Sequence, residues 1–176
     1  MSNTPNLSQA IRERSAARLA AVQALYEMDM TGVSPDQVLE DFLKERWKVQ
    51  PAKLDDLEEG DEDLSGLAVP DGGVLSELVR GVTARRDDLD GMVESSLSKD
   101  WTVERLETLL RAILRTGAFE LLTMPDVPAR VIINEYVNVA KAFYEETQPG
   151  LVNGVLDKLA RTLRGSEMEK NSSKAD

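Results

Sequence analysis

The chain has 176 residues, no cysteine, no histidine and a formal net charge of −11 at pH 7. The two missing residue types exclude disulfides, Cys/His zinc sites, thiol nucleophiles and histidine-based acid–base catalysis. The length is typical of one domain, and the chain has no apolar run of about 18 residues and no basic, apolar leader. We therefore expect a cytoplasmic protein that does not enter membranes.

The negative charge is unevenly distributed along the chain. Residues 31–73 hold twelve acidic and four basic residues, a net charge of −8, whereas residues 1–26 carry a net charge of +2. A local patch decides what binds at a surface, although net charge steers encounters over longer distances. The overall acidity therefore does not exclude a nucleic-acid partner.

Two helices are predicted in the N-terminal part. Apolar residues at spacings of three and four indicate a helix over residues 8–30, and Gly32 follows as a stop signal. Ser34, Pro35 and Asp36 then show the pattern of a second helix start, with a capping serine, a proline at the first position and an acid in the first turn. We expect this second helix to reach about residue 47.

Residues 50–73 interrupt the helical pattern. Seven of the nine residues at 55–63 are acidic, and glycine and proline punctuate the stretch. Like charges at this density repel, and there is little apolar surface to pack. We interpret the stretch as a mobile surface insert, with an acidic docking segment or nucleic-acid mimic as the alternative.

The helical pattern resumes at Val74 and continues to Leu97. Gly81 and Gly91 lie inside this pattern, where each glycine costs about 1 kcal/mol relative to alanine. They indicate a break or a close helix crossing, and the pattern fits either one bent helix or two helices split near residue 86.

Three further helices are predicted in the C-terminal half. The first begins at a cap at Thr102, with Trp101 and Leu106 placed as a hydrophobic staple. The second begins near Pro128, and the third covers about 150–164.

These patterns place the chain in the all-α class, because no strand alternation or hairpin dipeptide occurs. We expect six to seven helices in a single domain over residues 8–165. The remaining segment, residues 166–176, is polar and is predicted to be disordered.

No residue pattern supports catalysis. The chain lacks a glycine-rich phosphate loop, and no Glu-x-x-His repeat exists to hold a di-metal centre. The paired carboxylates, Glu58-Glu59 and Glu145-Glu146, fall in the acidic insert and at a helix end, and neither place offers the protected, differentiated environment that an acid–base pair needs. We expect a binding protein that is not an enzyme and that uses no metal or cofactor.

The arginines of the first predicted helix are the strongest candidates for a binding site. Arg14 and Arg18 fall together beside the apolar stripe, and Arg12 lies on the other side of the helix. Gln23 adds an amide that can read base edges. These residues favour RNA binding, and the alternative is that the arginines lie over the edge of the core and serve solubility.

Five segments of the sequence resemble one known family. Residues 12–26, RERSAARLAAVQALY, resemble the arginine-bearing first helix of the bacterial NusB family of transcription antitermination factors. Residues 126–135, DVPARVIINE, are similar to the family motif Pro-x-x-Val-x-Ile-Asn-Glu. The others are LVRGV at 78–82, Ala140-Lys141 and VNGVLDK at 152–158, all in the family's order.

The resemblance implies an all-helical fold of two small packed bundles that binds the single-stranded boxA element of nascent ribosomal RNA. It also implies a heterodimer with NusE, a small-subunit ribosomal protein, within an antitermination complex that lets RNA polymerase pass terminators. Carried over by position, Arg14 and Arg18 match the family's arginine-rich motif, and Tyr26 aligns with a tyrosine near the RNA. The chain departs from the motif at Ser15 and Ala16, where members can carry further arginines, and Arg12 partly compensates.

The predicted RNA-contact set is therefore Arg12, Arg14, Arg18, Gln23 and Tyr26. Guanidinium planes and aromatic rings can stack on splayed bases, and amides can pair with base edges. We interpret Asn153 and Gly154 instead as a satisfied polar contact at a close helix packing, rather than as RNA contacts.

The sequence leaves two other functions open. The NusB-like domain also begins certain ribosomal-RNA cytosine methyltransferases, but this chain has neither a Rossmann-like half nor a catalytic cysteine. The second is a protein-interaction scaffold or homodimer in which the arginine face is masked.

Overall fold

The structure is a computed structural model that describes residues 6–46 and 68–172. All regular structure in these residues is helical, which confirms the all-α prediction. The chain divides into two compact units, residues 1–80 and 81–176, which are described separately below. Most of the predicted acidic insert, residues 50–67, lies outside the described part of the chain.

The first unit is built around one long helix, α1 (Leu7–Thr31). The Asn6 side chain accepts a hydrogen bond from the backbone N–H of Ser8 at 3.3 Å and so caps the start of α1. Gly32 ends α1 in the left-handed conformation, with φ of 76°, and its N–H donates to the Met28 carbonyl at 2.9 Å. The predicted stop signal is therefore confirmed.

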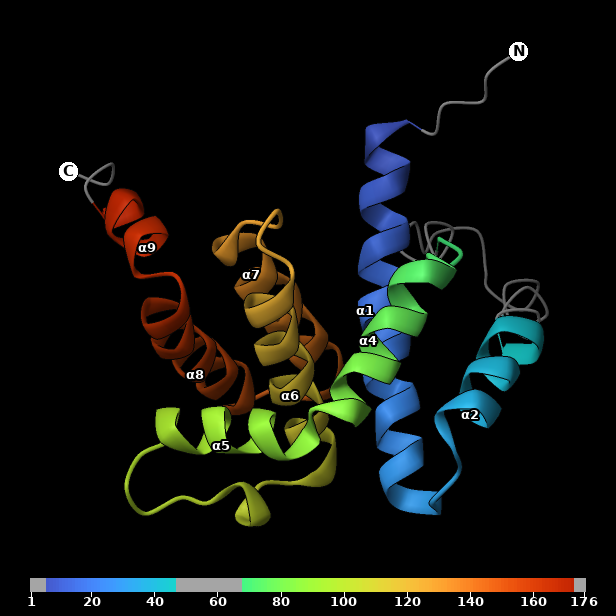
Figure 1. Cartoon of the computed structure of the whole chain (residues 1–176), viewed down its shortest axis with the longest axis horizontal. Helices are drawn as coiled ribbons and strands as arrows, with labels where there is room; N and C mark the ends of the chain where they lie inside the picture. Colours follow the sequence, from blue (N-terminus) through green and yellow to red (C-terminus); the bar gives the residue numbers. More distant parts are fainter. Residues whose placement is uncertain (1–5, 47–67, 173–176) are drawn as a thin grey trace. The chain divides into compact units, whose positions relative to one another are not determined.

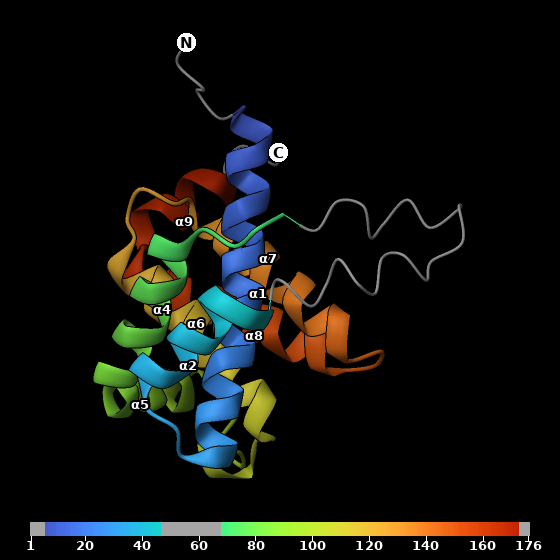
Figure 2. The ribbon, with the colours of Figure 1, turned by 90° about the vertical axis from the view of Figure 1, so that its right-hand side faces the viewer.

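The helix α2 (Pro35–Asp41) follows after a short connection and packs on α1, as Figure 2 shows. The Ser34 hydroxyl accepts from the N–H of Gln37 at 3.2 Å, which confirms the predicted cap. A π-helical turn, η1 (Phe42–Arg46), continues from α2.

The helix α4 (Gly72–Ala84) begins in the first unit, and two polar contacts tie it there. The N–H of Asp71 donates to the Glu13 carbonyl of α1 at 3.0 Å, and Arg80 pairs with Asp36 of α2 at 2.6 Å. The buried side chains of this unit are small or aliphatic, apart from Phe42 and Arg18, and they include Ala17, Ala20, Ala21, Val22, Ala24, Leu25, Val38, Leu39, Leu75, Leu78 and Val79.

The second unit contains the end of α4 and five more α-helices (Figure 1). These are α5 (Arg86–Ser96), α6 (Thr108–Thr123), α7 (Ala129–Phe143), α8 (Gln148–Leu163) and α9 (Gly165–Ser172), with a short 3₁₀ turn, η2 (Val103–Arg105), before α6. The split between α4 and α5 falls at Arg85, next to the predicted residue 86.

Helix α6 is the centre of the second unit, and α7 and α8 pack on it and on each other. Every residue from Ala112 to Leu121 is buried. Gly117 allows the close approach of α8, because a Cβ there would lie 2.8 Å from a terminal methyl of Leu156. Gly81 meets the ring of Phe119 in the same way, so of the two roles expected for this glycine, a break or a close crossing, the structure shows the close crossing.

Three predicted boundaries differ from the structure. Thr102 precedes only η2, and α6 begins six residues later. Val103 and Leu106 are buried in the connection between them, so tertiary packing holds this segment outside a regular α-helix. The last predicted helix, given as about 150–164, begins at Gln148 as α8, with Pro149 in its first turn, where proline is well tolerated.

The third difference is at the polar tail, where residues 165–172 form α9 instead of a disordered segment. Met168 is buried, and the Glu167 carboxylate accepts from the N–H of Ala129 at 2.7 Å at the start of α7. Arg164, just before α9, donates to the carbonyls of Leu121 and Met124 at 3.0 and 2.8 Å. These contacts with residues about 40 positions earlier hold this polar segment against the rest of the unit.

Candidate nucleic-acid interface

Helix α1 carries all five predicted RNA-contact residues, but it divides them between two faces. With 3.6 residues per turn, Arg12, Gln23 and Tyr26 fall within about 60° of one another around the axis. Arg14 lies about 160° from Arg12 by the same geometry, next to Arg18. The set therefore forms two groups on one helix and not a single cluster.

The first group is exposed to solvent along the helix. Arg12 and Gln23 are exposed, and Tyr26 retains 37% of its accessible surface. The guanidinium Nε of Arg12 donates to the Ser8 carbonyl at 3.4 Å, one turn back on the same helix. Arg12 and Tyr26 are separated by about 21 Å along the axis, a length that several nucleotides of a single strand can follow.

The second group is less accessible. Arg14 is half-buried, and its Nε donates to the Ala10 carbonyl at 3.4 Å. Arg18 is only 4% exposed, among the buried alanines of α1. A guanidinium in this position is part of the packed structure. Of the two arginines in this second group, only Arg14 reaches solvent.

A second polar surface lies in the other unit, around Asn153 and Gly154, where the sequence analysis predicted a close helix packing. Asn153 is exposed, and a Cβ added to Gly154 would meet no atom within 4 Å. The interpretation of Asn153-Gly154 as a tight helix crossing is therefore wrong. The close approach between α6 and α8 occurs instead at Gly117. No pattern in the sequence around Gly117 predicted this contact.

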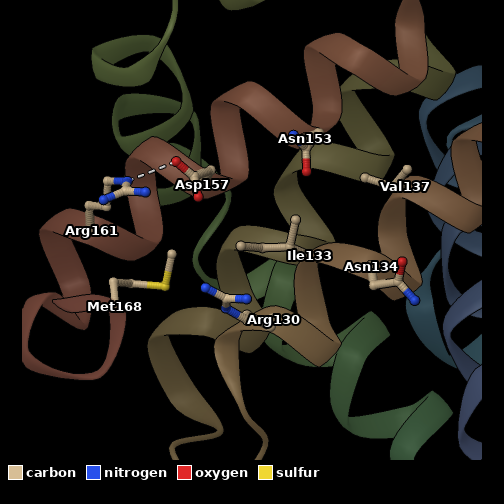
Figure 3. A pocket seen from close by; sticks show the side chains of 8 residues that line it. All are labelled: Arg130, Ile133, Asn134, Val137, Asn153, Asp157, Arg161 and Met168. Atoms are coloured by element: carbon tan, nitrogen blue, oxygen red, sulfur yellow. Dashed lines mark hydrogen bonds and ion pairs between the residues drawn. The ribbon is translucent and has the colours of Figure 1, made fainter. Parts of the chain in front are cut away.

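Asn153 instead lines a pocket with a volume of about 300 Å³ between α7, α8 and α9 (Figure 3). Helix α7 supplies one wall and α8 the other, and Met168 of α9 closes one end. The other lining residues are Arg130, Ile133, Asn134, Val137, Asp157 and Arg161. Several of them belong to the motifs at 126–135 and 152–158, but only the tertiary fold brings the two motifs together.

The described residues contain neither an acidic metal cluster nor a helix suited to a bilayer. Within residues 6–46 and 68–172, no three acidic side chains gather as they would to hold a metal ion. In the same part of the chain, no helix has the length and apolar character needed to cross a bilayer.

Comparison with known proteins identifies relatives over most of the chain. A profile of the NusB family matches residues 15–161. The transcription antitermination protein NusB of Brucella anthropi is 43% identical over 162 residues, which cover 92% of this chain and 90% of the relative. The protein of the same name from Rhodospirillum rubrum is 44% identical over 155 residues, 85% of this chain and 84% of the relative.

Solved structures show the same fold at lower sequence identity. NusB of T. maritima superimposes with a TM-score of 0.64 at 24% identity and covers 89% of this chain and 96% of its own. A crystal structure of the antitermination factors NusB and NusE in complex with dsRNA gives a TM-score of 0.63 at 22% identity, with 86% and 98% covered.

Proposed function

The chain belongs to the NusB family of transcription antitermination proteins, and we propose that it binds boxA-type single-stranded RNA through α1, together with NusE. In this function the protein acts in the cytoplasm, without catalysis, in a complex that lets RNA polymerase pass terminators in ribosomal RNA operons. The observation that carries the RNA assignment is the exposed stripe of Arg12, Gln23 and Tyr26 on α1.

The chemistry of this stripe suits a flexible RNA strand. An arginine can pair with a phosphate, an amide can pair with a base edge, and a tyrosine ring can stack on an unpaired base. Arg14 adds a second accessible guanidinium on the neighbouring face, and we assign to buried Arg18 a supporting role through the positive potential that it adds beside Arg14. NusE is the proposed partner because a family structure contains NusB and NusE with RNA.

RNA binding as a function of salt tests the proposal. We expect the double variant Arg12→Ala, Arg14→Ala to bind a boxA-like RNA more weakly than the unmodified protein. The loss of two phosphate contacts on a single strand should flatten the slope of log K against log salt by about 1.4. The measurement is fluorescence anisotropy of labelled RNA, with and without NusE and with single- and double-stranded RNA in parallel.

The control variant changes the net charge equally at exposed positions outside α1. Arg85→Ala with Lys99→Ala serves this purpose, because both residues are exposed and neither lies on α1. We expect this control to retain the unmodified slope. If both double variants behave alike, or if the α1 variant binds as the unmodified protein does, α1 is not the RNA site.

A second candidate function is self-association through α1. The ends of this helix expose large apolar side chains, with Leu7 at 71%, Ile11 at 49% and Met30 at 60% exposure. A homodimer that covers them would elute earlier in size-exclusion chromatography as concentration rises, and RNA would compete with it if the arginine face were masked. An unchanged elution volume across the concentration series would leave RNA binding as the function of α1.

A further inference from the structure

The pocket between α7, α8 and α9 contains polar groups that the fold itself does not use. The side chains of Arg130, Asn134 and Asn153 make no hydrogen bond or ion pair with the residues that the structure describes. Structural arginines of the same unit behave differently: Arg164 donates to several backbone carbonyls, and Arg115 is paired with Asp90. The groups at the pocket are therefore available to a ligand.

One positive charge of the pocket is free and another is neutralised. Arg161 pairs with Asp157 of the same helix, with Nε and Oδ2 2.9 Å apart, as the dashed line in Figure 3 shows. Arg130 projects from α7 toward the end of the pocket that Met168 closes (Figure 3). The pocket thus presents one unneutralised guanidinium, which is the preferred partner of a phosphate.

The remaining lining combines apolar and amide groups. Ile133, Val137 and Met168 supply an apolar surface, and the methionine sulfur is well suited to contact an aromatic ring. Asn134 and Asn153 each present a donor and an acceptor, the combination that pairs with the edge of a nucleobase. A volume of about 300 Å³ lies at the small end of ligand pockets and suits a single nucleotide.

We propose that this pocket binds one unstacked nucleotide of single-stranded RNA, with the phosphate at Arg130 and the base between the two asparagine amides over the apolar side chains. The proposal rests on the RNA-binding function assigned above, and it adds a contact in the second unit, away from α1. A peptide segment would use a similar apolar surface, but a nucleotide accounts for the single free guanidinium and both amides together.

Titration with mononucleotides tests the pocket without requiring RNA binding by α1. In NMR spectra of the 15N-labelled protein, we expect 5′-mononucleotides to shift the side-chain amide signals of Asn134 and Asn153, and ribose 5-phosphate to shift them less. Equal shifts with ribose 5-phosphate would reduce the pocket to a phosphate site and overturn the proposal. Shifts with NusE alone, and none with any mononucleotide, would make this a protein-binding surface and would also overturn it.

Substitutions connect the pocket to RNA. Arg130→Gln and Asn153→Ala should each weaken binding of a boxA-like RNA about fivefold or more, as expected for one lost base or phosphate contact. The matched controls are Lys141→Gln and Asn138→Ala, which lie exposed on α7 outside the pocket and should bind as the unmodified protein does.

The outcomes separate this proposal from the function on which it rests. If the unmodified protein binds RNA and the pocket variants match their controls, the pocket proposal fails and the α1 proposal stands. If the unmodified protein binds no RNA with or without NusE, the proposed function fails, and the mononucleotide titration alone decides whether the pocket takes a nucleotide.

Discussion

Arg18 shows how little of a charged residue's role can be judged from its position on a helix. It shares a face with Arg14 by spacing, yet it is 4% exposed, whereas Arg14 is half-buried. Its neighbours on the buried face of α1 are mostly alanines, which leave room for the long stem of an arginine. Arg18 therefore combines a packing role with its charge.

We predict that Arg18→Ala destabilises the protein more than Arg12→Ala. Truncating the buried arginine removes packed methylene groups and leaves its polar neighbours without a partner, a loss of about 1–3 kcal/mol. Arg12 is exposed, so its truncation should change the free energy of unfolding by less than about 0.5 kcal/mol. Urea unfolding followed by circular dichroism measures both, and an Arg18→Ala variant of unmodified stability that no longer binds RNA would make Arg18 a direct RNA contact.

The carboxylate of Glu40 illustrates a purely local interaction on an exposed face. The Lys44 ammonium, 2.7 Å away, lowers the pKa of Glu40 below its ordinary value, first by a hydrogen bond and then by its charge. Because the pKa is lowered in the folded state, the interaction contributes to the stability of the fold at pH values above the unfolded-state pKa. This contribution is lost as the pH falls through the folded-state pKa.

We predict that Lys44→Gln returns the pKa of Glu40 toward its ordinary value. The positive charge disappears in this variant, and the neutral glutamine amide is a weaker hydrogen-bond donor than the ammonium, so the carboxylate should take up its proton at a higher pH than in the unmodified protein. A carboxyl-carbon NMR titration of Glu40 measures this, and an identical titration in the variant would contradict the assignment of the shift to Lys44.

At the scale of elements, Gly117 of the central helix α6 and Gly154 of the motif at 152–158 have opposite surroundings. Gly117 of α6 faces α8 and α7, where a Cβ would lie 2.8 Å from Leu156 and 3.3 Å from Tyr136. Gly154 of α8 has no atom within 4 Å of the same position. Packing therefore requires a glycine at position 117, whereas nothing in the described structure requires one at position 154.

We predict opposite effects of substituting these two glycines. Gly117→Val overfills the crossing and should cost about 1–3 kcal/mol. Gly154→Ala removes backbone freedom from the unfolded chain at an open position and should stabilise by about 0.4–1 kcal/mol. Thermal unfolding of both variants provides the comparison, and destabilisation by Gly154→Ala would reveal a packing role at this position.

At the scale of the whole molecule, the charge balance opposes the proposed RNA partner. The net charge is −11, and residues 55–63 alone contain seven acidic side chains. An RNA strand approaching α1 meets this long-range repulsion as well as the local attraction of the arginines. The acidic segment should therefore set the strength and salt dependence of binding even without contacting RNA.

We predict that replacing the seven acids at 55–63 by their amides, which changes the net charge from −11 to −4, strengthens RNA binding at low salt. The gain should fade as salt rises above about 0.15 M, where the Debye length falls to about 8 Å. Affinity measured at two salt concentrations tests this, and weaker binding by the amide variant would indicate that the acids take part in the complex.

The sequence by itself determined most of the helices and the family. Capping at Ser34, termination at Gly32 and the spacing of apolar residues are local signals, which act within a few residues and remain in force in the folded chain. The motifs at 12–26, 126–135 and 152–158 pointed to the NusB family, and the later match over residues 15–161 confirmed it.

Only the tertiary structure decided which side chains are accessible and which distant residues meet. The burial of Arg18, the start of α6 after an irregular connection and the formation of α9 depend on contacts that lie far apart in sequence. The pocket has the same origin, because its residues extend from 130 to 168 along the chain. Local propensity carries no information about such contacts, since their free energy arises when separate helices bury common surface.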